Sequence, residues 1–287
     1  MPLDSIAEIL ASCSERNLAL RQVSAGASFE KMRATWRAML DSAESYDGGL
    51  RSVSGLSGGD GELMLRYAAG GAALGGGYIS EVIATALCVG ESNACMRKIV
   101  AAPTAGACGV LPAVLVPLYR RGEREEDILR ALYTAAGIGA VINSRASISG
   151  AVIAYKACIA GASGGCQAEI GTASAMAAGA LAQLRGGGPE QTANALAMAL
   201  KNLMGLICDP VAGLVEVPCV KRNVIGAVNA VSCADMALAG ITSRIPADEV
   251  IDCMGIVGER LPREFRETAR GGLAATPTGR AAWKQLK

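Results

Sequence analysis

Apolar residues recur along this chain at the three- and four-residue spacing of helices that bury one face. Proline opens two of these stretches and glycine follows one, which is typical of the first turn and the end of a helix. Period-two alternation rich in Val, Ile and Thr is missing, and aromatic residues make up only 3% of the chain. The pattern therefore predicts an all-α fold. The clearest stripes are Ile6, Ile9, Leu10 and Cys13 after a capping Asp4; Leu196, Leu200 and Leu203 in a helix over 189–204 that Pro189 opens and Gly205 ends; and Val250, Met254, Val257 and Leu261 after Pro246.

The composition indicates a large buried core with many glycines. Of the 287 residues, 51% are hydrophobic and 18% are charged, which argues against disorder. The 36 glycines are about one residue in eight, against a usual frequency of roughly 7%. Because glycine weakens a helix, this excess indicates close helix approach or backbone lying against a cofactor. We expect a single compact Gly/Ala-rich helical domain over residues 1–287, with a frayed tail over about 277–287.

The charge pattern favours small-molecule chemistry. The net charge is +1 and the Lys and Arg residues are scattered, so nothing points to nucleic acid or to an anionic membrane surface. Residues 99–119 are uncharged for about the length of a bilayer span, but three prolines interrupt them, and the weakly apolar region 135–168 contains Arg145. The N-terminus carries Asp4 and Glu8 without a basic region, unlike a signal peptide. We therefore expect a cytoplasmic protein that does not enter a membrane.

The sequence does not support two familiar kinds of catalytic or cofactor-binding motif. The segments 55–59 and 161–165 fit the G-x-S-x-G pattern, but a nucleophile elbow needs a histidine base and this chain has no histidine. We interpret both segments as glycine-rich turns. The chain has neither a G-x-x-x-x-G-K-[ST] phosphate loop nor a full dinucleotide fingerprint, which disfavours nucleotide cofactors.

Ten cysteines in a cytosolic chain would be mostly reduced, so metal ligation and plain burial are the alternatives for each. Burial is the ordinary role of a single cysteine such as Cys88 or Cys233. Cys166, Cys208 and Cys219 are separated by 42 and 11 residues, spacings that fit neither a zinc ribbon nor a ferredoxin. Three thiolates can nevertheless hold an iron–sulfur cluster and leave one iron free to act on a substrate. Spacing alone leaves both alternatives open.

Five blocks of sequence carry the most distinctive residue combinations: Gly90–Met96, Ile99–Gly106, Cys166–Glu169, Lys201–Leu214 and Val217–Asn223. Together, and in this order, they resemble the α-chain of the iron–sulfur-dependent bacterial L-serine dehydratases. The resemblance implies an all-helical catalytic domain in which Cys166, Cys208 and Cys219 hold a [4Fe-4S] cluster, without pyridoxal phosphate. It also implies β-elimination of water from L-serine to give pyruvate and ammonia, with a cluster iron acting as Lewis acid on the hydroxyl.

Other residues in these blocks are candidates for binding the substrate or tuning the cluster. Thr104 and Gly106 follow Pro103 in a polar interruption of an apolar run, where a hydroxyl and backbone N–H groups could receive the substrate carboxylate. A helix break packed in the core is the alternative. Glu169 and Asp209 could orient the substrate ammonium, although Asp209 could instead be a helix cap. The remaining candidates are Asn93, Asn202 and Asn223 as hydrogen-bonding groups, and Lys221, which with Arg222 could instead form an exposed pair at a helix end.

The expected catalytic base is missing from this chain. In single-chain members of the family an additional domain carries a Ser-Ser-Ser-His-Thr segment, and its histidine is the base that the resemblance implies. This chain has no histidine. We therefore expect a separate β-chain to supply that domain, in a hetero-oligomer that acts on L-serine.

The sequence also departs from the family pattern before the first ligand cysteine. Residues 156–163 read Lys-Ala-Cys-Ile-Ala-Gly-Ala-Ser where the family has Asn-Ala-Ser-Ile-Ser-Gly-Ala-Glu, and a family-like Ala-Ser-Ile-Ser-Gly stands earlier, at 146–150. Two alternatives therefore stay open. One is a similar domain that acts on cysteine, with sulfide as the leaving group, and the other is a non-catalytic or membrane-associated helical protein whose cysteines are merely buried.

Overall fold

Helices account for the regular structure of the computed structural model, which describes residues 25–149 and 159–286. Within these ranges the chain forms no β-strand, and one isolated bridge pairs Cys208 with Arg266. The all-α prediction is confirmed. The α-helices and the short 3-10 helices (η) are α3 Ala25–Glu44, α4 Asp60–Ala69, α5 Gly76–Ala94, η1 Ala105–Ala107, α6 Val110–Arg120, α7 Glu125–Ser149, α8 Gly161–Gly164, α9 Cys166–Leu184, α10 Pro189–Asn202, η2 Val211–Gly213, α11 Cys219–Leu238, α12 Ala247–Arg260, η3 Arg263–Phe265, η4 Gly272–Ala275 and α13 Pro277–Gln285.

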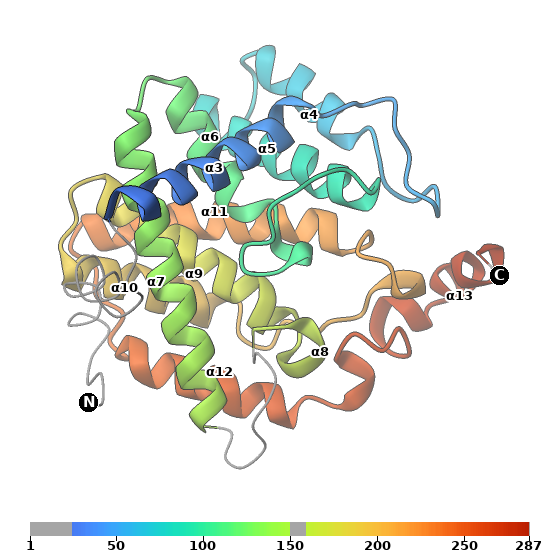
Figure 1. Ribbon diagram of the computed structural model, residues 1–287. Coiled ribbons are helices and arrows are strands. Elements are labelled where there is room, and N and C mark those ends of the chain that lie inside the picture. The colour runs from blue at the N-terminus through green and yellow to red at the C-terminus, as the bar shows by residue number, and fades with distance from the viewer. Residues whose placement is uncertain (1–24, 150–158, 287) are drawn as a thin grey trace.

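Helix α9 lies at the centre of the arrangement, packed against α7, α10 and α11 (Figure 1). All of its residues from Ile170 to Ala182 are buried. Small residues let the neighbouring helices approach closely, because a Cβ on Gly179 would lie 2.2 Å from Ile138 Cδ1 in α7 and 3.3 Å from Thr192 Cγ2 in α10. Close helix approach, the first expected use of the glycine excess, is therefore confirmed in the helix that begins at Cys166.

Two helices predicted from apolar stripes are confirmed. Helix α10 begins at Pro189 as predicted and ends two residues before 204, and the following turn contains Gly205 with φ 86°. Helix α12 begins directly after Pro246. The stripe residues Leu196, Leu200, Leu203, Val250 and Met254 are buried, while Val257 and Leu261 are partly exposed. The helix predicted after Asp4 lies outside the described residues.

Residues 277–285, for which the sequence predicts a frayed tail, form helix α13. Thr276 caps this helix, because its Oγ1 accepts a hydrogen bond of 3.1 Å from the backbone N–H of Gly279, and Pro277 occupies the first turn. Ala282 is buried, and the helix packs against η2 and η4. The contact with η2 joins segments that are distant in sequence, which is why the local pattern did not indicate it.

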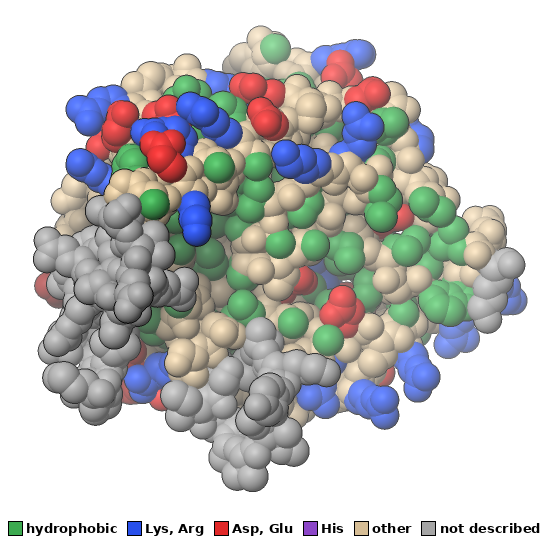
Figure 2. Space-filling model, in the orientation of Figure 1, with side chains coloured by type: hydrophobic (Ala, Val, Ile, Leu, Met, Phe, Trp, Pro, Cys, Tyr) green, Lys and Arg blue, Asp and Glu red, His purple; other side chains and the backbone are tan. Residues whose placement is uncertain are grey.

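No helix in the described part of the chain has both the length and the apolar character needed to cross a membrane. The uncharged run 99–119 is divided between a loop, η1 and most of α6. Figure 2 shows charged side chains of both signs mainly around the margin of one face, with hydrophobic side chains across its middle.

Replacing Leu196 with Ala is expected to lower the free energy of unfolding by about 2–5 kcal/mol, because this fully buried side chain would leave a cavity. Leu63→Ala is the matched control, since Leu63 in α4 is 65% exposed and its truncation should change stability by about 0.5 kcal/mol or less. Urea unfolding followed by circular dichroism measures both. Equal losses in the two variants would contradict the placement of Leu196 in the core.

Candidate functional site

Three buried cysteines come together from three separate segments. Cys166 is the first residue of α9, Cys219 is the first residue of α11, and Cys208 lies in the loop between α10 and η2. Their exposed fractions are 1%, 5% and 2%, respectively. The positive end of a helix dipole stabilises a nearby anion, so the dipoles of α9 and α11 favour thiolates at Cys166 and Cys219, while burial opposes them.

The three thiols are close enough to affect one another. A hydrogen bond with Cys208 lowers the pKa of Cys166, and the positive charge of Arg222 acts in the same direction. The same hydrogen bond, together with burial, raises the pKa of Cys208, while burial and the charge of Cys166 raise the pKa of Cys219. Cys166 is therefore the thiol whose anion the protein stabilises most directly.

Backbone packs tightly beside this group. Gly161, the first residue of α8, has no room for a side chain, because a Cβ there would lie 2.8 Å from Cys208 Sγ. Figure 1 shows α8 next to the N-terminal end of α9. Of the two segments expected to be glycine-rich turns, 161–165 thus contains this short helix, and 55–59 precedes α4 with positive φ at three of its glycines.

The cysteine group can be compared with what a single metal ion and an iron–sulfur cluster require of their ligands. Within residues 25–149 and 159–286, no three Cys, Asp or Glu side chains are grouped so that they could hold one metal ion. A cluster of four irons is a larger body whose thiolate ligands stand at separate corners, and its usual protein ligands are cysteines alone. The three buried cysteines from three segments match the residue type that such a cluster needs, whereas Cys88 and Cys233 are buried elsewhere, as expected.

Arg222 forms hydrogen bonds with two of the cysteine-containing segments. Its Nη1 donates to Cys166 Sγ at 3.3 Å and to the carbonyl of Ile207 at 2.8 Å, and its Nη2 donates to Asp209 Oδ1 at 2.8 Å. The Asp209 carboxylate is buried, and its second oxygen accepts the backbone N–H of Leu273 at 2.8 Å. Asp209 is therefore neither a simple helix cap nor a free ammonium ligand in this structure.

Sequence reasoning missed the position of Arg222. Arg222 follows Cys219 by three residues in α11, so the two share a face of the helix, and that spacing is the signal that could have identified it. Lys221, the predicted catalytic residue, points elsewhere: its side chain is 70% exposed and its Nζ lies 2.7 Å from Asp60 Oδ2. The structure therefore separates the expected pair, with one cation buried among the cysteines and the other at the surface.

The loop that contains η1 is where four predicted site residues meet, namely Asn93, Gly106, Cys219 and Asn223. The Asn223 amide donates to the carbonyls of Gly106 at 2.8 Å and Cys219 at 2.9 Å, and its Oδ1 accepts the N–H of Gly109 at 2.8 Å. Asn93 Nδ2 donates to the carbonyl of Ala105 at 3.0 Å. Two side-chain amides therefore fix this loop next to the first residue of α11.

The carboxyl group of Glu169 accepts hydrogen bonds from the loop that contains η1. The Thr104 hydroxyl donates to Glu169 Oε1, and the Gly106 backbone is also hydrogen bonded to this carboxyl group. Burial raises the pKa of Glu169, and these two hydrogen bonds oppose the rise. A Cβ on Gly106 would lie 2.6 Å from Glu169 Oε1, so a larger residue here would displace the Glu169 carboxyl group from its present position. Asn202 is not part of this group, because its amide contacts Asn229 and Cys233.

Comparison with known proteins identifies related sequences. The family model described as "Serine dehydratase alpha chain" matches residues 5–274. This chain belongs to the serine dehydratase α-chain family. The resemblance found in the sequence blocks is therefore confirmed.

Several relatives carry the α-chain name. The "Probable L-serine dehydratase, alpha chain" of Bacillus subtilis (strain 168) is 51% identical over 239 residues, which cover 83% of this chain and 76% of the relative. The protein of the same name from Latilactobacillus sakei is 52% identical over 207 residues, which cover 72% of this chain and 94% of the relative. "L-serine dehydratase TdcG" of Escherichia coli (strain K12) is 45% identical over 192 residues, but they cover only 40% of that longer protein.

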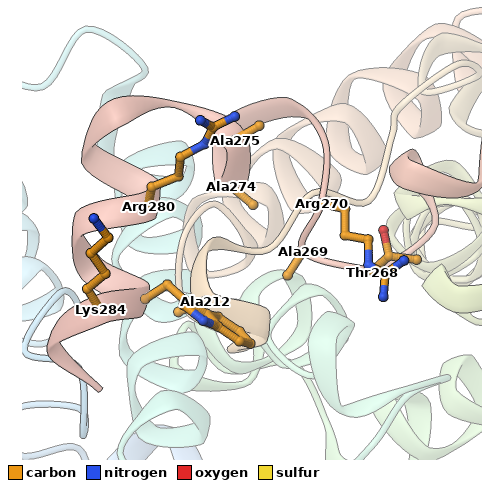
Figure 3. Close-up of a pocket in the computed structure, with 9 residues that line it drawn as sticks. Ala212, Thr268, Ala269, Arg270, Ala274, Ala275, Arg280 and Lys284 are labelled. Carbon is orange, nitrogen blue, oxygen red and sulfur yellow. The ribbon is translucent and has the colours of Figure 1, made fainter. Parts of the chain in front are cut away.

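A separate pocket of about 470 Å³ lies near the C-terminal end of this family member. Figure 3 shows Arg280 and Lys284 on α13 and Arg270 on the segment before η4. Ala212 of η2 also lines the pocket, a few residues from Cys208, but none of the residues predicted from the sequence does. The size of a pocket therefore does not locate the cysteine site in this structure.

Replacing Arg222 with Met is expected to lower the free energy of unfolding by about 3–5 kcal/mol, because it leaves the Asp209 carboxylate buried without its cation. Lys221→Met is the matched control on the neighbouring residue, and loss of its exposed ion pair should cost about 1 kcal/mol or less. Chemical unfolding of the two variants gives the comparison. A loss in Lys221→Met as large as that in Arg222→Met would contradict this assignment of the two cations.

Proposed function

We propose that this chain is the catalytic subunit of an iron–sulfur-dependent L-serine dehydratase, which converts L-serine to pyruvate and ammonia by eliminating water. The observation that carries the proposal is the group of three buried thiols around Arg222, within a chain of the serine dehydratase α-chain family. Relatives named L-serine dehydratase support the substrate assignment over the cysteine-cleaving alternative.

Cys166, Cys208 and Cys219 would hold a [4Fe-4S] cluster, without pyridoxal phosphate. When bound, such a cluster with three thiolate ligands supplies an iron that can act as Lewis acid on the substrate hydroxyl. The protein supplies charge and shielding: Arg222 balances part of the thiolate charge, and burial of all three cysteines keeps bulk water from their sulfur atoms. Gly161 allows backbone to approach Cys208 without displacing its sulfur.

The loop at η1 would position the substrate side of the site. Thr104 and Gly106 already hold one carboxyl group, that of Glu169, so the loop has the donors that a carboxylate needs. We assign Thr104, Gly106 and Glu169 to one hydrogen-bonded unit that faces the substrate, with Asn93 and Asn223 as the positioning residues that hold the loop in place. Lys221 lies outside this unit.

A partner chain would complete the reaction. Removal of the α-proton of serine needs a base, and the sequence has no histidine to provide the usual one. The α-chain names of the relatives imply a β-chain, and the longer Escherichia coli relative contains a large segment beyond the matched part. We assign the histidine base to a separate β-chain in a cytoplasmic hetero-oligomer. No role with nucleic acid or in a membrane is assigned.

Anaerobic purification of the chain with and without its β-partner tests the proposal. We expect about four irons and a similar amount of sulfide per chain, with serine-dependent pyruvate only when the partner is present. Threonine and cysteine are assayed beside serine. Iron without pyruvate from serine would refute the substrate assignment, and absence of iron after cluster reconstitution would reduce the three cysteines to core packing.

Single alanine substitutions of the three ligand cysteines give a second test. Cys166→Ala, Cys208→Ala and Cys219→Ala should each abolish the visible absorbance of the cluster and reduce pyruvate formation by about a hundredfold or more, because the iron loses a thiolate ligand. Cys233→Ala is the matched control, since Cys233 is also fully buried but contacts Asn202 and Asn229 instead. Loss of the cluster in this control as well would mean that burial, rather than ligation, explains the effect.

A further inference from the structure

Glu267 has an unusual backbone conformation next to the cysteine site. Its φ is 60°, in the left-handed region that residues with a Cβ rarely adopt. Strain of this kind persists only where surrounding contacts impose it, and it is concentrated at functional sites. The position is occupied by Glu267 and not by glycine, which would adopt this conformation without strain. The side chain is therefore the feature to explain.

Backbone hydrogen bonds fix Glu267 against Cys208. The Glu267 N–H donates to the Cys208 carbonyl at 2.9 Å, and the Cys208 N–H donates to the Phe265 carbonyl at 2.8 Å. The Glu267 carboxylate points to the same place as the thiol, because Glu267 Oε2 and Cys208 Sγ both lie close to the position of a Gly161 Cβ, at 3.4 and 2.8 Å. An exposed carboxylate thus stands beside a buried cysteine of the proposed cluster.

The charge of this carboxylate is available to a ligand. Within the described residues Glu267 has no ion pair, whereas Asp209 is paired with Arg222 and Glu169 is hydrogen bonded to Thr104. The negative charge of Glu267 contributes to the raised pKa values of Glu169, Cys208 and Cys219, so it lies within electrostatic range of all three. Among the described residues around the cysteines, the carboxylates of Glu169, Asp209 and Glu267 outnumber the buried Arg222 guanidinium, which favours a positively charged ligand.

We infer that Glu267 binds the α-ammonium of the amino-acid substrate and so selects amino acids over the corresponding hydroxy acids. This inference rests on the proposed function and names the group that receives one end of its substrate. A carboxylate forms strong, charge-assisted hydrogen bonds with an ammonium. Glu169 and Asp209, the two carboxylates that the sequence suggested for this task, are engaged within the protein, whereas Glu267 is exposed and faces the cysteines.

The test uses the Glu267→Gln variant of the iron-loaded chain together with its β-partner. Glutamine keeps the size of the side chain but removes the charge, so iron and sulfide content should stay unchanged. The KM for L-serine should rise about tenfold or more, the loss expected for one charge-assisted hydrogen bond, while kcat changes much less. Inhibition by 3-hydroxypropanoate, which resembles serine but lacks the amino group, should be unaffected.

Glu264→Gln is the matched control, because Glu264 is another exposed carboxylate of the same segment, in η3. It should leave both the KM for L-serine and inhibition by 3-hydroxypropanoate unchanged. An unchanged KM in Glu267→Gln, a loss confined to kcat, or an equal loss of serine and 3-hydroxypropanoate binding would overturn the ammonium site alone. Absence of pyruvate with the unsubstituted chain and its partner would overturn the proposed function and this inference together.

Discussion

The cysteine site depends on one buried cation. Burying a guanidinium costs free energy unless its N–H groups are hydrogen bonded. Arg222 donates to a thiol on α9 and to a carbonyl and a carboxylate on the loop after α10. These segments cannot move apart without leaving a charge unpaired. Arg222 therefore fixes the relative positions of Cys166 and Cys208, while its own place on α11 connects them to Cys219.

The packing of α9 gives this cation a rigid base. The helix is rich in alanine and glycine, so α7, α10 and α11 pack against it at short range and leave little freedom to shift. At its N-terminal end the same helix supplies Cys166 and Glu169, which face the cysteine group and the η1 loop. Dense packing at one end of the helix thus holds the reactive groups at the other end, where polar residues interrupt the core.

Local patterns predicted the parts of the structure that local physics determines. The helices at 189–204 and after Pro246 have apolar stripes and proline starts, and both were confirmed. The sequence also grouped the three cysteines with the η1 loop through its family resemblance. The sequence did not predict contacts between distant segments. Lys221 and Arg222 are neighbours in the sequence, so their different environments were not apparent from it. Nothing near residue 277 indicated that α13 would pack against η2.

The backbone bridge between Cys208 and Arg266 has a consequence for the order in which the site is built. A chain made from its N-terminus contains Cys166 and Cys208 long before Phe265, Glu267 and Leu273, whose backbone groups fix the Cys208–Asp209 loop. Until those residues have left the ribosome, the Cys208–Asp209 loop lacks the hydrogen bonds that they make to it. The full set of contacts around the cysteine group is therefore complete only after residue 273 has been made.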